Sequence, residues 1–147
     1  MKWKHIHSFD NLSPEDVYNF LKLRQDIFII EQDCIYDDID SLDFESEHLM
    51  LYDNSILAAY SRIVPAGKKF DLPSIGRIAV AMNYRNKGLG RKLVEKSIEL
   101  LREDGHEAII IEAQVYLQRF YESAGFIKIS DPYELDGIVH IKMKLNL

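Results

Sequence analysis

The sequence predicts a mixed α/β fold in a single domain, and three observations support this prediction. The chain has 147 residues, which is enough for one domain with a sizeable core. Runs that are typical of β-strands alternate along the chain with segments of helical periodicity. In the second half, a strand, a helix and a short, mostly apolar strand follow one another, which is the pattern of a β-α-β crossover.

The first half is expected to contain one helix and three strands. Residues 3–8 read as a short strand. Ser13 is a good N-cap and Pro14 suits the first helical position, so we expect a helix whose apolar spacing continues to about Phe28. Two strand-like runs separated by a typical hairpin turn at Asp53-Asn54 come next, EHLMLYD (47–53) and SILAAYSRIV (55–64).

Residues 33–47 lead from that helix into these strands and contain seven acidic residues. We expect them to form a solvated loop, with at most a short helix, that attracts a cationic acceptor. The acidic cluster does not match an EF-hand calcium loop, because no glycine occupies the turn. No metal site is therefore expected.

The second half is expected to contain alternating strands and helices. SIGRIAVAM (74–82) reads as a strand with Ile78, Val80 and Met82 on one face. A helix with an apolar stripe then runs to about Asp104, and Gly105 is a typical C-cap. The remaining elements are a central strand AIIIEA (108–113) parallel to its neighbour, a helix over about 117–124, and a closing strand GIVHIKMKL (137–145).

The composition excludes several classes of protein. A net charge of −6 and a pI near 5.3 argue against nucleic-acid binding, which needs a basic face. Cys34 is the only cysteine, so neither an internal disulfide nor a thiolate-rich metal site can form. No apolar run approaches the roughly 18 residues of a membrane span, and the N-terminus lacks the apolar stretch of a signal peptide. We expect a cytoplasmic protein with no membrane partner.

The stretch YRNKGLGRKL (84–93) concentrates glycine and positive charge between a strand and a helix. Gly88 and Gly90 let the backbone approach a ligand, and the unpaired N–H groups of a first helical turn carry about half a positive charge. Such a place suits a pyrophosphate. The stretch fails the P-loop pattern and the dinucleotide fingerprint, because Arg91-Lys92-Leu93 follows the second glycine. The alternative is a glycine turn that caps a helix with solvated basic residues.

Two motifs resemble the GNAT superfamily of acyl-CoA N-acyltransferases. Arg85-x-x-Gly88-x-Gly90 matches the pyrophosphate loop of that family, and Phe120-Tyr121 followed by Ala124-Gly125-Phe126 matches its fourth-helix signature. The resemblance covers nearly the whole chain in the order of its elements. Four stretches are similar to the ElaA-like branch in particular, namely LRQDIFIIEQDCIYDDID (23–40), IGRIAV (75–80), AQVYLQRFY (113–121) and DGIVHIKM (136–143).

This resemblance implies a fold and an activity. The fold would be one acetyltransferase domain over residues 1–147, a mostly antiparallel twisted sheet with helices on both faces and a central parallel strand pair splayed for the cofactor. The activity would be transfer of an acetyl group from acetyl-CoA directly to a primary amine of a small molecule or peptide. The alternative is a catalytically silent domain that binds acyl-CoA or a partner, and a different acyl donor is a third reading. The family also contains many homodimers.

The resemblance implies which residues contact the cofactor. The backbone of residues 85–91 would hold the pyrophosphate, and the pantetheine arm would lie along residues 78–80. A backbone N–H near Val80 would polarise the thioester carbonyl. Gln114 stands where relatives often have an asparagine that touches the cofactor. The expected cofactor-binding residues are Ile78, Ala79, Val80, Arg85, Asn86, Lys87, Gly88, Leu89, Gly90, Arg91, Gln114 and Tyr121.

Tyr121 is the expected general acid, because a phenol can protonate a thiolate whose parent pKa is about 8.5. It would otherwise be a space-filling core tyrosine. Glu112 is the first candidate for the general base, since a carboxylate at the end of an apolar strand is unusual, although a solvated strand end also explains it. His48 and His140 are further candidates, and so is a chain of waters. Many family members carry a glutamate where this chain has Arg77.

Four residues are expected to bind the acceptor. Glu31 and Gln32 follow the first helix and resemble acceptor-pocket residues of the ElaA-like branch, and His48 and His140 complete the set. Each could instead be an ordinary polar residue of the surface. Cys34 is a weaker candidate for an acyl-carrying nucleophile, because no activating base lies near it in the sequence.

Overall fold

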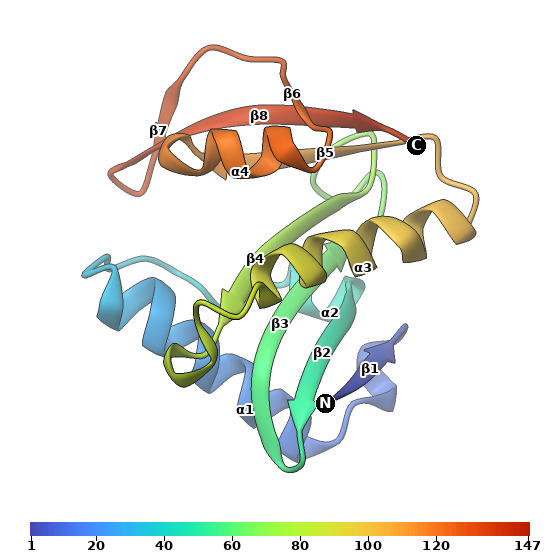
Figure 1. Ribbon diagram of the computed structural model, residues 1–147, viewed down its shortest axis with the longest axis vertical. Coiled ribbons are helices and arrows are strands. Elements are labelled where there is room, and N and C mark those ends of the chain that lie inside the picture. Colours follow the sequence, from blue (N-terminus) through green and yellow to red (C-terminus); the bar gives the residue numbers. More distant parts are fainter.

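The computed structural model describes residues 1–147 and arranges the strands in two sheets (Figure 1). All strand pairs within these sheets are antiparallel. The first sheet has the order β1 (Lys2–Ile6), β2 (Glu47–Asp53), β3 (Ile56–Val64), β4 (Ser74–Val80). The second has the order β5 (Ala108–Gln114), β8 (Ile138–Asn146), β6 (Ile127–Lys128), and β7 (Tyr133–Leu135) also pairs with β8. The prediction of a mixed, mostly antiparallel fold is confirmed.

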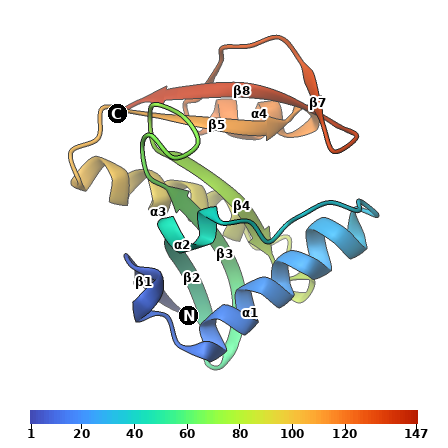
Figure 2. The ribbon, with the colours of Figure 1, turned by 180° about the vertical axis from the view of Figure 1, so that it is seen from behind.

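Helices cover opposite faces of the first sheet. α1 (Pro14–Arg24) lies on the face that is nearer the viewer in Figure 2, where Phe20 packs with Met50 and Tyr60. α3 (Leu89–Glu103) lies on the face that is nearer the viewer in Figure 1 and packs against β2 and β3. α4 (Gln118–Ser123) covers β5 and β8. None of these helices combines the length and apolarity that a bilayer-spanning helix requires.

The first helix begins as predicted and ends differently. The Ser13 hydroxyl accepts a hydrogen bond from the Asp16 N–H (3.0 Å), and the Asp16 carboxylate accepts one from the Ser13 N–H, so both halves of a capping box form. The chain continues beyond α1 as a π-helical segment, η2 (Gln25–Glu31). The other short elements are α2 (Leu42–Glu45), η1 (Phe9–Asn11), η3 (Met82–Tyr84) and η4 (Val115–Leu117).

β4 and β5 come close to each other but form no ladder. A single backbone hydrogen bond joins them, from the Ile110 N–H to the carbonyl of Pro73 just before β4 (3.1 Å). From that point the two strands run apart (Figure 1). An apolar cluster that includes Ile75 of β4, Ile111 of β5 and Val94 of α3 holds the two sheets together on one side.

β4 carries a bulge at Arg77. Gly76 pairs with Arg62 and Ala79 pairs with Tyr60, so one residue of β3 faces two residues of β4. Arg77 adopts a left-handed backbone conformation with φ 51°. A bulge leaves its extra residue out of the ladder and bends the strand, and this one lies where β4 turns away from β5.

The acidic segment 33–47 is not a solvated loop throughout, and this prediction was wrong for Asp38 and Asp43, which are both 4% exposed. The Arg24 side chain donates from Nε to Asp38 (2.9 Å) and from Nη1 to Asp43 (2.8 Å). Arg62 donates to the same oxygen of Asp43 at 2.9 Å. The arginines come from α1 and β3, so the pairing depends on the tertiary fold and leaves no sign within the acidic segment itself.

Candidate active site

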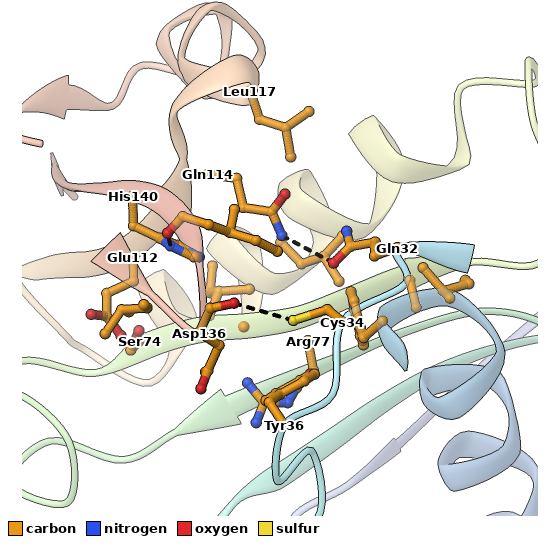
Figure 3. Close-up of a pocket in the computed structure, with 18 of the residues that line it drawn as sticks. Gln32, Cys34, Tyr36, Ser74, Arg77, Glu112, Gln114, Leu117, Asp136 and His140 are labelled. Carbon is orange, nitrogen blue, oxygen red and sulfur yellow. Dashed lines mark hydrogen bonds between the residues drawn. The ribbon is translucent and has the colours of Figure 1, made fainter. Parts of the chain in front are cut away.

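A pocket of about 600 Å³ opens between the two sheets. β4 lines one wall, and β5 and the β7–β8 hairpin line the other, while η2 and the acidic segment close a third side. Figure 3 shows Gln114 and His140 on one side of this space, with Gln32 and Cys34 across from them. The pocket therefore draws its residues from four separate stretches of the chain, 27–42, 69–85, 112–121 and 135–140.

Most of the predicted site residues line this pocket. Residues 78–80 present the end of β4 to it, and Gln114 presents the end of β5. The Gln114 amide lies 3.5 Å from the Gln32 oxygen, so the two predicted regions touch across the pocket (Figure 3). The predicted residues that line the pocket are Glu31, Gln32, Ile78, Ala79, Val80, Arg85, Glu112, Gln114, Tyr121 and His140.

The glycine loop lies beside the pocket, and only Arg85 of this loop lines it. Gly88 is the N-cap of α3 and has φ 74°, a left-handed conformation that glycine adopts without strain. Lys92 donates the first N–H bond within the helix, to the Gly88 carbonyl (3.1 Å), so the N–H groups of residues 89–91 have no intrahelical partner. The loop thus offers the free donors that the sequence predicted.

Side chains of this loop are partly committed to other contacts. Arg85 forms a bidentate ion pair with Glu31, with Nη–Oε distances of 2.6 and 2.7 Å, which lowers the pKa of Glu31. Arg91 donates to the hydroxyl and the carbonyl of Ser123 in α4. Lys87 lies over the ring of Tyr84, 5.3 Å from its centroid. The backbone rather than the arginines is therefore the free part of the loop.

Tyr121 lies at the base of the pocket in α4. It is 8% exposed and packs edge-on against Phe120 and Phe126. Burial raises the pKa of its phenol. The hydroxyl therefore carries its proton throughout the physiological pH range, as a proton donor must.

Glu112 is a weaker base than the sequence suggested. One oxygen pairs with the Lys69 ammonium (2.7 Å), and the other accepts a hydrogen bond from the Tyr133 hydroxyl (2.8 Å). Burial alone raises the pKa of Glu112, but these contacts outweigh it and lower the pKa below the ordinary value. Its carboxylate is ionised, and each of its two oxygens already has one partner.

His140 presents a free ring nitrogen to the pocket. Its Nδ1 lies 2.8 Å from the carbonyl oxygen of Ile138, and because a carbonyl can only accept, Nδ1 must carry the proton. In the neutral ring, Nε2 then holds the lone pair and is able to accept a proton. Among the candidate bases, His140 is the one whose proton-accepting atom has no partner.

His48 does not lie in the acceptor region, and its prediction as an acceptor-binding residue needs correction. The ring is 0% exposed and stacks on Phe20 at 4.8 Å. One ring nitrogen lies 2.8 Å from the Tyr60 hydroxyl and the other 2.9 Å from the Asp43 carbonyl. His48 alternates along β2 with residues on the other face, which directs it into the core under α1.

Tyr36 and Asp136 were missed as pocket residues because they come from loops that meet only in the folded chain. Tyr36 and Arg77 stack with the guanidinium 5.6 Å from the ring centroid, and Arg77 pairs with Asp38 at 2.8 Å. The Cys34 thiol lies 3.3 Å from the Asp136 carbonyl at the tip of the β7–β8 hairpin. Figure 3 shows this contact across the mouth of the pocket.

Comparison with known proteins decides the family. Residues 10–147 match the model of the acetyltransferase (GNAT) domain. The chain belongs to the GNAT acetyltransferase family. The UPF0039 protein sll0451 of Synechocystis is 40% identical over 137 residues, which are 92% of this chain and 89% of the relative.

The ElaA resemblance is confirmed as well. Protein ElaA of Escherichia coli is 35% identical over 146 residues, which are 97% of this chain and 95% of that protein. The crystal structure of Escherichia coli ElaA superposes on this chain with a TM-score of 0.89 over 98% of each chain. An acyl-CoA N-acyltransferase from Pseudomonas aeruginosa is 30% identical and superposes with a TM-score of 0.92 over 98% of each chain. The GNAT fold therefore extends over nearly the whole of this protein.

Proposed function

We propose that this GNAT domain is an acetyl-CoA-dependent N-acetyltransferase that acts by direct transfer to a primary amine of a small molecule or peptide. The observation that carries the proposal is the convergence of a protonated phenol, a free imidazole nitrogen and the end of β4 on one pocket. Tyr121, His140 and Val80 all line this space, although they lie in three separate elements.

The acyl-CoA would enter where β4 and β5 run apart. We propose that the two strands form the parallel pair expected from the family resemblance. Their facing edges share only the Ile110–Pro73 hydrogen bond, so backbone N–H and C=O groups of these edges are left to pair with a pantetheine arm. The pyrophosphate would lie on the free N–H groups of residues 89–91. Gly90 brings this loop next to the pocket. A Cβ atom added at Gly90 would lie 3.9 Å from the side chains of both Val80 and Phe120, which is van der Waals contact.

Acyl-CoA, when bound, supplies the thioester, and the chain supplies the hydrogen-bond donor for the departing sulfur. Tyr121 is held in one orientation by its aromatic neighbours and keeps its proton because burial raises its pKa. A thiolate of parent pKa about 8.5 is a weaker base than the phenolate of this tyrosine, so Tyr121 acts by donating a hydrogen bond to the departing sulfur and keeps its own proton.

The acceptor amine must lose a proton before it attacks, which costs about 4–5 kcal/mol at neutral pH for an alkyl ammonium. His140 Nε2 is our candidate for the group that receives this proton, directly or through water. Glu112 is less suited, since Lys69 and Tyr133 already occupy its oxygens. This choice changes the order of the candidates that the sequence suggested.

The acceptor side of the pocket favours a cation. Asp37 and Asp136 line it with carboxylates that no ion pair or hydrogen bond engages, whereas the Glu31 and Glu112 carboxylates are paired with basic side chains. An amine that is protonated in solution would be drawn to this side before it is deprotonated for attack.

A panel of primary amines, assayed for acetyl-CoA-dependent thiol release, tests the proposal. We expect turnover on at least one cationic amine, a loss of 10²-fold or more in kcat for Tyr121→Phe, and a smaller loss with a shifted pH profile for His140→Gln. Tyr18→Phe and His106→Gln are matched controls that should keep full activity. If acetyl-CoA binds but no amine is turned over, the catalytically silent alternative is correct. If Tyr121→Phe retains full turnover, the acid assignment is wrong.

A further inference from the structure

A cluster of metal-ligating side chains lies on the first sheet, outside the pocket. His5 in β1, His7 just after it and Glu47 at the start of β2 bring one ligand atom each within 4.8 Å of one another. β1 is the edge strand, and β2 and β3 separate it from β4, the strand that lines the pocket. None of the three residues lines the pocket.

The three side chains already point at one spot. Glu47 Oε1 lies 2.7 Å from His5 Nε2 and 3.1 Å from His7 Nδ1, and the two rings are tilted with centroids 4.2 Å apart. Residues two apart on a strand share a face, so the His-x-His spacing places both rings on the same side of β1. The antiparallel pairing of β1 with β2, in which His5 faces Leu49, brings Glu47 alongside them.

The spacing of these atoms suits a small divalent cation. Zn²⁺ bonds to imidazole nitrogen and carboxylate oxygen at about 2.0–2.2 Å, so ligand atoms in a tetrahedral site lie about 3.3–3.5 Å apart. The two contacts to Glu47 are within about 1 Å of that spacing. His7 is 67% exposed, so its ring is free to adjust, whereas His5 and Glu47 are 15% and 21% exposed and hold their positions.

The charge of the cluster also suits a cation. Glu47 brings a carboxylate oxygen to the cluster, and His5 and His7 bring one ring nitrogen each. Two imidazoles and one carboxylate are ligands for Zn²⁺, Ni²⁺ and Cu²⁺ rather than for Mg²⁺ or Ca²⁺, which prefer oxygen.

We propose that His5, His7 and Glu47 form a binding site for a divalent transition metal that ties the edge strand β1 to β2. The remaining coordination positions are filled by water. No local pattern in the sequence predicts this site, because His5 and Glu47 are 42 residues apart and only the pairing of two strands joins them.

The test uses the full chain without a histidine tag, titrated with Zn²⁺ in a calorimeter. We expect one ion per chain with micromolar affinity, a loss of tenfold or more for His7→Gln and for Glu47→Gln, and no binding for the double variant His5→Gln/His7→Gln. His140→Gln, a histidine change in the pocket, is the matched control and should bind Zn²⁺ as the unmodified protein does. Saturating Zn²⁺ should raise Tm by about 5–10 °C when the free ion is at about 100 times its Kd.

A separate optical signal is available on the same strand. Trp3 is the only tryptophan and lies two residues before His5 on the same face, so Cu²⁺ at the cluster should quench its fluorescence. The proposal is overturned if the double variant binds Zn²⁺ with unchanged affinity, or if the unmodified protein takes up no stoichiometric ion. Melting curves in a chelator establish that the variants are folded.

Discussion

Replacing Asp43 with asparagine should destabilise the protein more than any other single carboxylate change. Asp43 is 4% exposed and accepts hydrogen bonds from two guanidinium groups, those of Arg24 at 2.8 and 3.2 Å and Arg62 at 2.9 Å. Arg24 and Arg62 are themselves 0% and 1% exposed. The substitution keeps the shape of the side chain and removes its charge, which leaves two buried arginines to share the remaining aspartates.

The magnitude follows from the balance of this network. Each guanidinium–carboxylate pair at about 4 Å between charge centres is worth about 4 kcal/mol at an effective dielectric constant of 20, against a desolvation cost of similar size. Removing one partner loses the attraction and keeps the cost, so we expect a loss of about 3–5 kcal/mol in the free energy of unfolding. That is a large part of the roughly 5–15 kcal/mol that holds a domain folded.

Urea denaturation measures this loss, with an expected fall of about 2 M in the midpoint concentration. The control is Asp26→Asn, which breaks an exposed i,i+4 pair with Lys22 and should cost only about 0.3–0.5 kcal/mol. If the two variants differ by less than about 1 kcal/mol, Asp43 is not the centre of a buried ion network and the argument fails.

Three further predictions concern acid stability, backbone strain and coenzyme binding. The contacts of Asp43 with Arg24 and Arg62 outweigh its burial and hold its folded pKa below the ordinary 3.8. Its contribution to the free energy of unfolding is therefore complete above that pH and is lost on acidification. Between pH 6 and pH 3, Tm should fall less steeply for Asp43→Asn than for the unmodified protein. Gly125→Ala should cost about 1–3 kcal/mol in urea melts, because φ is 103° and the new Cβ would lie 3.0 Å from Leu145 Cδ1; an unchanged midpoint would contradict this. Glu31→Gln should tighten coenzyme A binding about 3–10-fold in calorimetry, because the change releases Arg85 and removes a negative charge near the phosphates. Weaker binding would mean that Glu31 orients Arg85 instead.

The parts of the fold that the sequence predicted correctly are those with a local physical cause. Ser13 and Pro14 start α1 because the N-cap and first-turn rules involve neighbouring residues only. Gly88 is visible in the same way as the start of α3, since a left-handed N-cap favours glycine whatever the rest of the chain does. Tyr121 and Gln114 were found through the family resemblance, and they line the same pocket.

The parts that were missed depend on partners far along the chain. Asp38 and Asp43 read as solvated because their arginines come from other elements. His48 was expected to bind the acceptor, because nothing near it in the sequence shows that β2 turns it beneath Phe20 of α1. The preference for His140 over Glu112 as a base needs the positions of single hydrogen-bond partners, and no sequence pattern contains these.

The contact between Arg85 and Glu31 has a consequence for the kinetics of the two substrates. The ion pair closes the gap between the glycine loop and the η2 segment, and both residues line the pocket. A donor whose phosphates compete for Arg85 would set Glu31 free, and the released carboxylate would then face an incoming amine. We therefore expect an ordered mechanism in which acyl-CoA binds first, and a dead-end amine analogue should be uncompetitive with respect to acetyl-CoA.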